Sequence, residues 1–137
     1  MRKMALDYGE MRIGIAFSDL LNIIANGYET YTRRGEQVDI DYLTKLARER
    51  EVDTIILGLP VNMDGTEGER AQATRDFGTK LQQASGLAIK YFDERLTSAS
   101  AERLLIEADM RREKRKQVID KVSATIILQN YLDMFSK

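Results

Sequence analysis

The chain contains no cysteine and no histidine. Without cysteine it cannot form a disulfide framework, a thiolate nucleophile or a cysteine-ligated zinc site, and this composition suits a reducing compartment. Histidine is the commonest general base near neutral pH and the commonest zinc ligand, so its absence excludes Ser-His-Asp triads, Cys-His pairs and most zinc hydrolases. Any catalysis must therefore depend on carboxylate, lysine, tyrosine or hydroxyl side chains.

Long hydrophobic runs are absent as well. Only a few apolar residues precede Asp7, fewer than a signal peptide needs, and no later run approaches the ~18 apolar residues of a membrane span. We therefore expect a cytoplasmic protein that has no membrane partner. The formal net charge of −1 and the pI of about 5.6 argue against a basic protein that coats nucleic acid. Positive charge is instead concentrated in residues 111–116, five of which are basic.

The length of 137 residues and the hydrophobic content of 43% suit one compact domain, which we expect to span residues 1–137. Apolar periodicity predicts strands at 3–8, 12–18, 24–32, 52–57 and 87–92. Helices are expected at 36–50, between Gly68 and Gly86, from Thr97 or Ser98 onward, and at 118–135. Short turns favour an antiparallel start, and the alternation that follows predicts an α/β fold with a mixed sheet covered by helices.

Acidic residues stand where these elements end or begin. Asp7 is near the end of the first predicted strand, and Asp93 and Glu94 directly follow the fifth. Parallel strands deliver side chains to a crevice at their carboxyl ends, so these acids are expected to converge there. Asp120 lies early in the last helix on the same stripe as the apolar Ala124, and it should therefore face the sheet.

Oxygen ligands of this kind favour hard divalent cations such as Mg²⁺ or Mn²⁺. Two ions roughly 3.5 to 4 Å apart can stabilise both the attacking and the leaving oxygen of an in-line phosphodiester displacement. The acids therefore predict a nuclease centre. Each acid also has a structural alternative: Asp7 as a turn former before Gly9, Glu94 as a partner of Arg95, and Asp120 as a charge that favours the N-terminus of a helix.

The sequence blocks of the YqgF family, also called RuvX, are similar in order and spacing to four segments of this chain. These are Asp-Tyr-Gly-Glu-Met-Arg-Ile-Gly-Ile-Ala-Phe-Ser-Asp (7–19), Gly-Leu-Pro-Val-Asn-Met-Asp-Gly-Thr-Glu-Gly-Glu-Arg-Ala (58–71), Asp-Glu-Arg-Leu-Thr-Ser (93–98) and Asp-Lys-Val-Ser-Ala (120–124). The resemblance implies a ribonuclease H-like fold, a mixed five-stranded sheet flanked by helices. It also implies a nuclease that matures the 5′ end of the 16S ribosomal RNA precursor and, in some members, resolves Holliday junctions in DNA.

On the matching blocks, the resemblance assigns the metal-binding acids to Asp7, Glu94 and Asp120, with Mg²⁺ or Mn²⁺ as the expected cofactor. Many relatives within the wider fold carry an acid at the end of the fourth strand, where this chain has Gly58-Leu59-Pro60. The second ligand must then follow the fifth strand, as either Asp93 or Glu94. We prefer Glu94 because its longer side chain reaches further.

Basic and amide side chains supply candidate contacts to nucleic acid. Arg12, Arg70 and Arg95 are suited to bidentate phosphate contacts, and Asn62 to a hydrogen bond with a sugar or base edge. The alternative for each arginine is a structural ion pair. Part of the loop around Asp64-Gly65 can equally serve only to shape the backbone.

The basic segment 111–116, which includes Arg115, is the best candidate for contacts to the phosphate backbone that do not depend on base sequence. Lys121, in the last family block, is a further candidate. The alternative for the segment is a solvated, mobile linker between two helices, which can also become ordered when substrate binds.

Two other functions remain compatible with the sequence. The Asp7-x-Gly9 hairpin also resembles the phosphate-binding hairpin of the actin, hexokinase and sugar-kinase superfamily, although those proteins need a second such domain. The chain can also be a non-catalytic module that recognises a ribosomal precursor through its basic segment. The oligomeric state, monomer or homodimer, is open; branched-DNA resolvases act as dimers because two strands are cut symmetrically.

Overall fold

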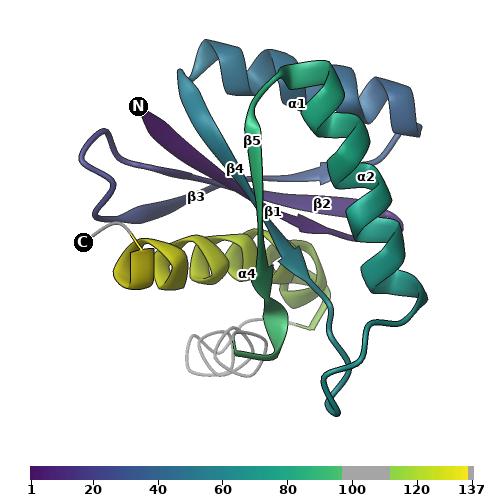
Figure 1. The fold of residues 1–137 in the computed structure, drawn as a ribbon. Helices are drawn as coiled ribbons and strands as arrows, with labels where there is room; N and C mark the ends of the chain where they lie inside the picture. Colours follow the sequence, from purple (N-terminus) through teal and green to yellow (C-terminus); the bar gives the residue numbers. More distant parts are fainter. Residues whose placement is uncertain (97–111, 136–137) are drawn as a thin grey trace.

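The structure is a computed structural model that describes the backbone of residues 1–96 and 112–135, and the side chains of residues 1–95 and 121–135 (Figure 1). The elements follow in the order β1 (Arg2–Tyr8), β2 (Arg12–Ser18), β3 (Ala25–Thr32), α1 (Glu36–Glu49), β4 (Val52–Leu59), α2 (Glu69–Ser85), β5 (Ala88–Asp93), a 3₁₀ turn (Glu94–Leu96) and α4 (Arg112–Phe135). The helix predicted from Thr97 or Ser98 lies outside the described residues. Within them, no helix combines the length and apolar character needed to cross a membrane.

The strands form one five-stranded sheet in the order β3-β2-β1-β4-β5. β2 pairs antiparallel with both β1 and β3, and β4 pairs in parallel with both β1 and β5. The prediction of a mixed five-stranded sheet is therefore confirmed. Because β1, β4 and β5 run in parallel, their carboxyl ends lie side by side at one end of the strands, which we call the carboxyl edge of the sheet.

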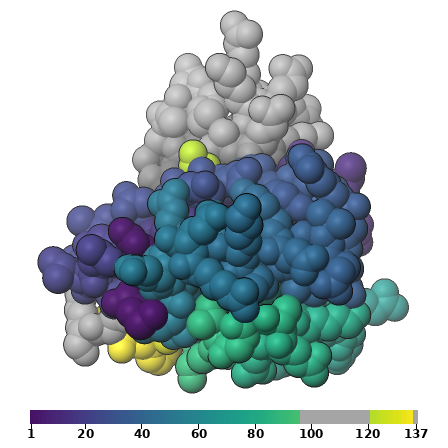
Figure 2. Space-filling model, turned by 90° about the horizontal axis from the view of Figure 1, so that it is seen from above, coloured from purple at the N-terminus to yellow at the C-terminus, as the bar shows by residue number. Residues whose placement is uncertain are grey.

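Helices cover both faces of this sheet. The helices α1 and α2 lie on one face and α4 on the other (Figure 1), and Figure 2 shows α1 (blue) and α2 (green) side by side from above. Alternation along β1 separates the two cores. Met4 and Leu6 pack with Leu43 of α1 and Phe77 of α2, whereas Ala5 packs in the second core, on the α4 face.

The α4 face is built from small residues that allow the helix to approach the sheet closely. Three strand residues and one helix residue in this core are alanines, and larger side chains of α4 fill the remaining space. The buried residues of α4 are Ala124, Ile127, Leu128 and Leu132. This spacing of three and four residues marks the stripe of a helix that packs on a core.

Two predicted boundaries differ from the structure by two residues or more. The fourth strand does not stop at Gly58, because Gly58 and Leu59 pair with Phe92 and Asp93 of β5. The last helix begins at Arg112, about two turns before the predicted start. Most of the basic segment 111–116 is therefore helical and not a linker. Arginine, lysine, glutamate and glutamine are all good helix formers, and no glycine or proline interrupts them.

Candidate active site

Asp7 lies at the sheet edge where the parallel strands end. It pairs with Gly14 of β2, and the preceding pair of Leu6 with Leu57 places Gly58 of β4 on its other side. Since Ala5 belongs to the α4 core, alternation places Asp7 on that same face of the sheet. The Asp7 side chain is half-buried, and a glycine lies on each of the two neighbouring strands.

Glu94 reaches the same place from β5. A Cβ atom added to Gly58 would lie 2.6 Å from Glu94 Oε1 and 2.9 Å from Glu94 Cγ. The Glu94 side chain therefore occupies the space that the missing side chain of Gly58 leaves open. Neighbouring strands are ~4.8 Å apart, so this position brings the carboxylate beside Asp7. Asp7 and Glu94 each make further interactions.

Asp93, the alternative to Glu94, is engaged elsewhere. Its Oδ1 accepts a hydrogen bond from the Arg95 backbone N–H at 2.9 Å, and its Oδ2 accepts one from Arg95 Nε at 2.8 Å. The Arg95 side chain holds the pKa of Asp93 below its usual value. Asp93 also follows Phe92 of the α4 core, so alternation turns it toward the opposite face from Asp7.

The third predicted acid, Asp120, belongs to α4, but its side chain lies outside the described part of the chain, as does that of Arg115. Among the described residues, no group of three or more acidic, histidine or cysteine side chains forms a candidate metal site. The described helix residues nevertheless fix the orientation of α4. Ala124 and Ile127, on the stripe predicted for Asp120, are fully buried against the sheet.

The loop between β4 and α2 is shaped by its own polar side chains. Asn62 Nδ2 donates to Thr66 Oγ1 at 3.1 Å, and Asp64 accepts from both the backbone and the hydroxyl of Thr66. The Thr66 hydroxyl is the main cause of the lowered pKa of Asp64. Gly65 adopts φ = 90°, a conformation that favours glycine. The structural alternative therefore holds for Asp64, and partly for Asn62.

Arg12 and Arg70 both lie at the turn that connects β1 and β2. With Gly9 and Glu10 they line a hollow of about 380 Å³. Arg70 also borders a hollow of about 390 Å³ with Asn62, so it stands between the hairpin and the loop. Arg70 is exposed and has no ion pair within the described ranges, whereas Arg12 makes a further interaction. This arrangement gathers three of the predicted substrate contacts.

The other two described candidates are placed differently. Arg95 forms the ion pair with Asp93, with 2.6 Å between Nη2 and Oδ2, but remains partly exposed next to Gly65 of the loop. Lys121 packs its aliphatic stem on β3, since a Cβ on Gly27 would lie 2.9 Å from Lys121 Cε. The ion-pair alternative is therefore observed for Arg95.

A buried ion pair between Arg33 and Asp39, which the sequence analysis did not predict, stabilises the turn between β1 and β2. Arg33 Nη1 donates to the Gly9 carbonyl at 3.2 Å, and its guanidinium lies 4.7 Å from the Tyr8 ring centroid. Arg33 Nε donates to Asp39 Oδ2 at 2.9 Å, and the Asp39 side chain is fully buried. One signal was available: Asp39 stands four residues before Leu43, on the apolar stripe of α1.

Comparisons with known proteins agree with this architecture. The family model of RuvX, described as a Holliday junction resolvase, matches residues 1–134. Two similar relatives carry the name "Putative pre-16S rRNA nuclease". The protein of Syntrophomonas wolfei is 50% identical over 97% of this chain and 94% of its own length. That of Halothermothrix orenii is 50% identical over 100% of this chain and 98% of its own.

Solved structures support the fold alone, because their sequence identities are low. T. thermophilus RuvC in complex with a Holliday junction has a TM-score of 0.63 at 8% identity, and covers 98% of this chain and 94% of that one. The fowlpox virus Holliday junction resolvase has a TM-score of 0.60 at 11% identity, with coverages of 98% and 100%. The predicted ribonuclease H-like fold is thus confirmed, and the chain belongs to the RuvX family.

Proposed function

We propose that this chain is a metal-dependent endonuclease that cuts a phosphodiester bond at the 5′ end of the 16S ribosomal RNA precursor in the cytoplasm. The observation that carries the proposal is the position of Glu94 against Gly58, on the strand next to Asp7, at the shared carboxyl edge of β1, β4 and β5. The names of the curated relatives support the RNA substrate. The RuvX match also favours a nuclease over the kinase alternative.

The residues present fit a divalent ion such as Mg²⁺ or Mn²⁺. Asp7 and Glu94 offer carboxylate oxygens, the ligands these hard cations prefer, and a Cβ on Gly58 would lie 2.6 Å from Glu94 Oε1, so the absence of that side chain leaves room for this carboxylate. Asp120 completes the proposed donor set from α4. A bound divalent ion supplies positive charge that stabilises the developing charge on a phosphate and lowers the pKa of water, a role that histidine cannot fill in this chain.

The chain's own residues then bind and orient the nucleic acid. Arg12 and Arg70 are proposed to hold a phosphate in the hollow beside Gly9, which follows Asp7 by two residues. Asn62 and Arg95 extend this surface along the loop. Arg115 and Lys121 are proposed to contact the phosphate backbone from α4. The Asp93–Arg95 pair leaves the exposed side of the guanidinium available for such a contact.

A cleavage assay with matched substrates tests the proposed function. Purified protein is incubated with a labelled 16S precursor fragment and with a four-way DNA junction, in Mg²⁺, in Mn²⁺ and in EDTA. We expect cutting that requires the metal, with the RNA preferred. Preferential cutting of the junction would assign the resolvase activity by which the family is described. Binding of RNA without cutting would establish the non-catalytic module instead.

Replacing Glu94 with Gln should reduce cleavage by about 100-fold, or ~2.7 kcal/mol of barrier, because one metal-binding charge is lost. Asp93→Asn is the matched control, since Asp93 is bonded to Arg95 and faces away from Asp7. We expect its rate to stay within about three-fold of wild type, which is less than 1 kcal/mol. The reverse order of effects in the same assay would assign the second ligand to Asp93.

Replacing Gly58 with Ala should reduce cleavage by roughly 10-fold to 100-fold through displacement of Glu94. The added Cβ would lie 2.6 Å from both Glu94 Oε1 and Ile127 Cδ1, so the carboxylate has to move. Gly68→Ala is the control, because a Cβ there stays at least 3.4 Å from its neighbours. Urea unfolding checks that Gly58→Ala still folds. Wild-type cleavage by the folded variant would contradict the proposed position of Glu94.

A further inference from the structure

The loop between β2 and β3 exposes an unusual concentration of aliphatic side chains. Residues 19–24 carry four large aliphatic side chains, each more than half exposed: Leu20 58%, Leu21 76%, Ile23 57% and Ile24 55%. Isolated exposed apolar residues are normal on protein surfaces, but a contiguous apolar patch marks an interaction site. We name this segment the aliphatic loop.

The aliphatic loop is held in one conformation by hydrogen bonds. Asp19 Oδ1 accepts from the Ile23 N–H at 2.7 Å and from the Ile24 N–H at 3.3 Å, and the Asp19 N–H donates to the Ile24 carbonyl. Gln129 of α4 donates to the Ile23 carbonyl and accepts from the Ala25 N–H, both at 2.9 Å. The chain therefore presents these side chains to solvent from an ordered backbone.

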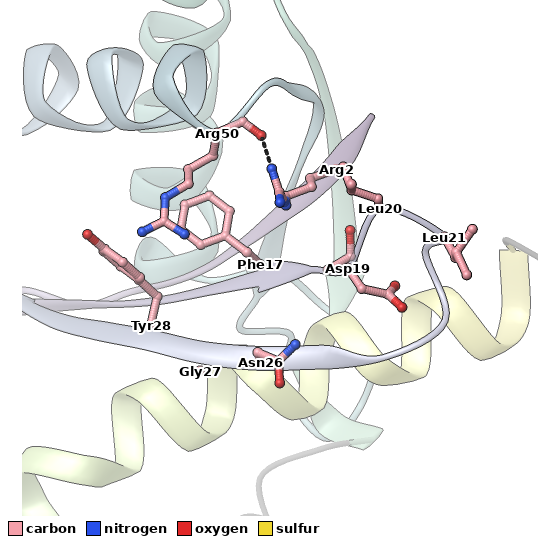
Figure 3. A pocket seen from close by; sticks show the side chains of 10 residues that line it. Arg2, Phe17, Asp19, Leu20, Leu21, Asn26, Gly27, Tyr28 and Arg50 are labelled. Atoms are coloured by element: carbon pink, nitrogen blue, oxygen red, sulfur yellow. Dashed lines mark hydrogen bonds between the residues drawn. The ribbon is translucent and has the colours of Figure 1, made fainter.

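A hollow of about 650 Å³ lies beside the aliphatic loop. Leu20 and Leu21 form part of its wall, together with Tyr28, Phe17, Arg2 and Arg50 (Figure 3). The Arg50 guanidinium lies 4.6 Å from the Tyr28 ring centroid and 5.2 Å from that of Phe17. Arg2 Nη1 donates to the Arg50 carbonyl at 3.1 Å. Stacking on the rings and this hydrogen bond orient the two arginines.

These arginines add positive charge to an apolar surface. Within the described parts of the chain, neither Arg2 nor Arg50 forms an ion pair with an acid. Asp19 also lines the hollow, but its Oδ1 is already bonded to two backbone N–H groups of the loop. The chemistry that complements this surface is therefore a carboxylate next to an apolar side chain.

We propose that the hollow and the aliphatic loop bind a segment of a partner protein that combines acidic residues with aliphatic or aromatic ones. Arginine and tyrosine are enriched at the centres of protein–protein interfaces, where apolar neighbours exclude water. A nucleic acid matches the surface less well, since four exposed aliphatic side chains gain little from a phosphate backbone.

This surface is separate from the candidate active site. Phe17 pairs with Met4 near the start of β1, whereas Gly14 pairs with Asp7 near its end, so the two sites lie toward opposite ends of these strands. Figures 1 and 2 show the start of the chain and the β2–β3 loop at the same end of the molecule. A partner bound there leaves the Asp7 edge accessible, so the proposal does not depend on the proposed function.

Selection of a random displayed peptide library on the full chain tests this proposal. We expect enrichment of peptides that place Asp or Glu beside Leu, Ile or Phe. A synthetic peptide from this set should bind about ten-fold more weakly to Leu21→Ser and to Arg2→Gln, the loss typical of a residue at the centre of an interface. Met63→Ser should bind like wild type, because it removes a 90% exposed apolar side chain elsewhere.

Four outcomes would overturn the proposal, provided that circular dichroism shows the variants to be folded. The first is an absence of enriched peptides, and the second is enrichment of peptides without acids. The third is a homodimer in light scattering that Leu21→Ser dissociates, because the occupant would then be a second copy. The fourth is single-stranded RNA that binds more tightly than the peptides and is lost in Leu21→Ser.

Discussion

Replacing Asp7 with Asn should abolish metal-dependent cleavage, with a rate reduced by about 1000-fold or more, or ~4 kcal/mol of barrier. Asn has nearly the same shape but no charge, so a divalent ion loses its ligand at the centre of the site. Asp7 is flanked by Gly14 and Gly58, and Glu94, which shares its face, is already a separate ligand in the proposed donor set.

The same substitution should leave the protein at least as stable as wild type. Asn keeps nearly the same shape as Asp and removes one of the two carboxylate charges on this face of the sheet, so packing should be retained. Urea unfolding without metal should therefore show an equal or higher midpoint for Asp7→Asn. Stability gained as activity is lost is typical of residues placed for function. A residue that merely formed a turn would show the opposite, with lower stability and retained activity.

Asp41→Asn is the matched control for both measurements. Asp41 is an exposed acid of α1 that accepts a hydrogen bond from Gln37, far in sequence from the sheet edge. Its removal should change neither cleavage nor the unfolding midpoint measurably. Cleavage by Asp7→Asn at the rate of wild type, with the same metal dependence, would contradict the assignment of Asp7 as a ligand.

The position of Asp7 could be predicted from local sequence, because strand alternation and the following Gly9 are local signals. The second metal ligand, Asp93 or Glu94, could not be predicted from such local signals. The choice depends on the chain leaving β5 in a 3₁₀ turn and on a contact with Gly58, about 36 residues earlier. Long-range contacts of this kind leave no periodic pattern in the sequence.

Gly58 illustrates the same limit. From sequence, its lack of a side chain predicts the end of a strand. In the structure it lies inside β4, between β1 and β5, where its missing side chain makes room for Glu94. Glu94, which directly follows β5, occupies the space beside Gly58. Only the sheet register reveals that relation.

The basic residues were harder to place than the acids. The strand that begins at Arg12 was predicted correctly, and Arg12 meets Arg70 in one hollow. The segment 111–116 was predicted to contact the phosphate backbone of a nucleic acid, with a solvated linker between two helices as the alternative, and this alternative did not hold. Arginine, lysine and glutamate have high helix propensities, which favour a helix over a linker. Most of these residues do belong to α4. Local propensity therefore outweighed charge at this point.

Replacing Asp39 with Asn should lower the free energy of unfolding by about 3–5 kcal/mol, the usual loss when one member of a buried ion pair is removed. The Asp39 carboxylate is fully buried and accepts hydrogen bonds from Arg33 Nε, the Tyr31 hydroxyl and the Arg34 backbone N–H. An amide cannot accept all three bonds with the same charge, and Arg33 would keep a buried charge without its partner.

The difference in unfolding free energy between wild type and Asp39→Asn should depend on pH. Burial raises the pKa of Asp39, but the hydrogen bonds from Arg34, Arg33 and Tyr31 outweigh burial and hold the pKa below its usual value. The folded pKa therefore lies below the unfolded pKa of about 3.9. The stability contributed by Asp39 is present above that unfolded value and is lost as pH falls through the folded pKa. Asp39→Asn should therefore lose less stability than wild type as pH falls below about 3.9.

Urea unfolding at neutral and acidic pH measures both effects, and Asp53→Asn is the control. Asp53 pairs with Lys3 at 2.7 Å, but its side chain is 37% exposed, so its loss should cost only ~0–1 kcal/mol. An equal loss in the two variants would show that burial does not distinguish the pairs. Because Arg33 also bonds the Gly9 carbonyl and stacks on Tyr8, folded Asp39→Asn should cleave more slowly than folded Asp53→Asn. That difference would connect the Arg33–Asp39 pair to the position of Asp7.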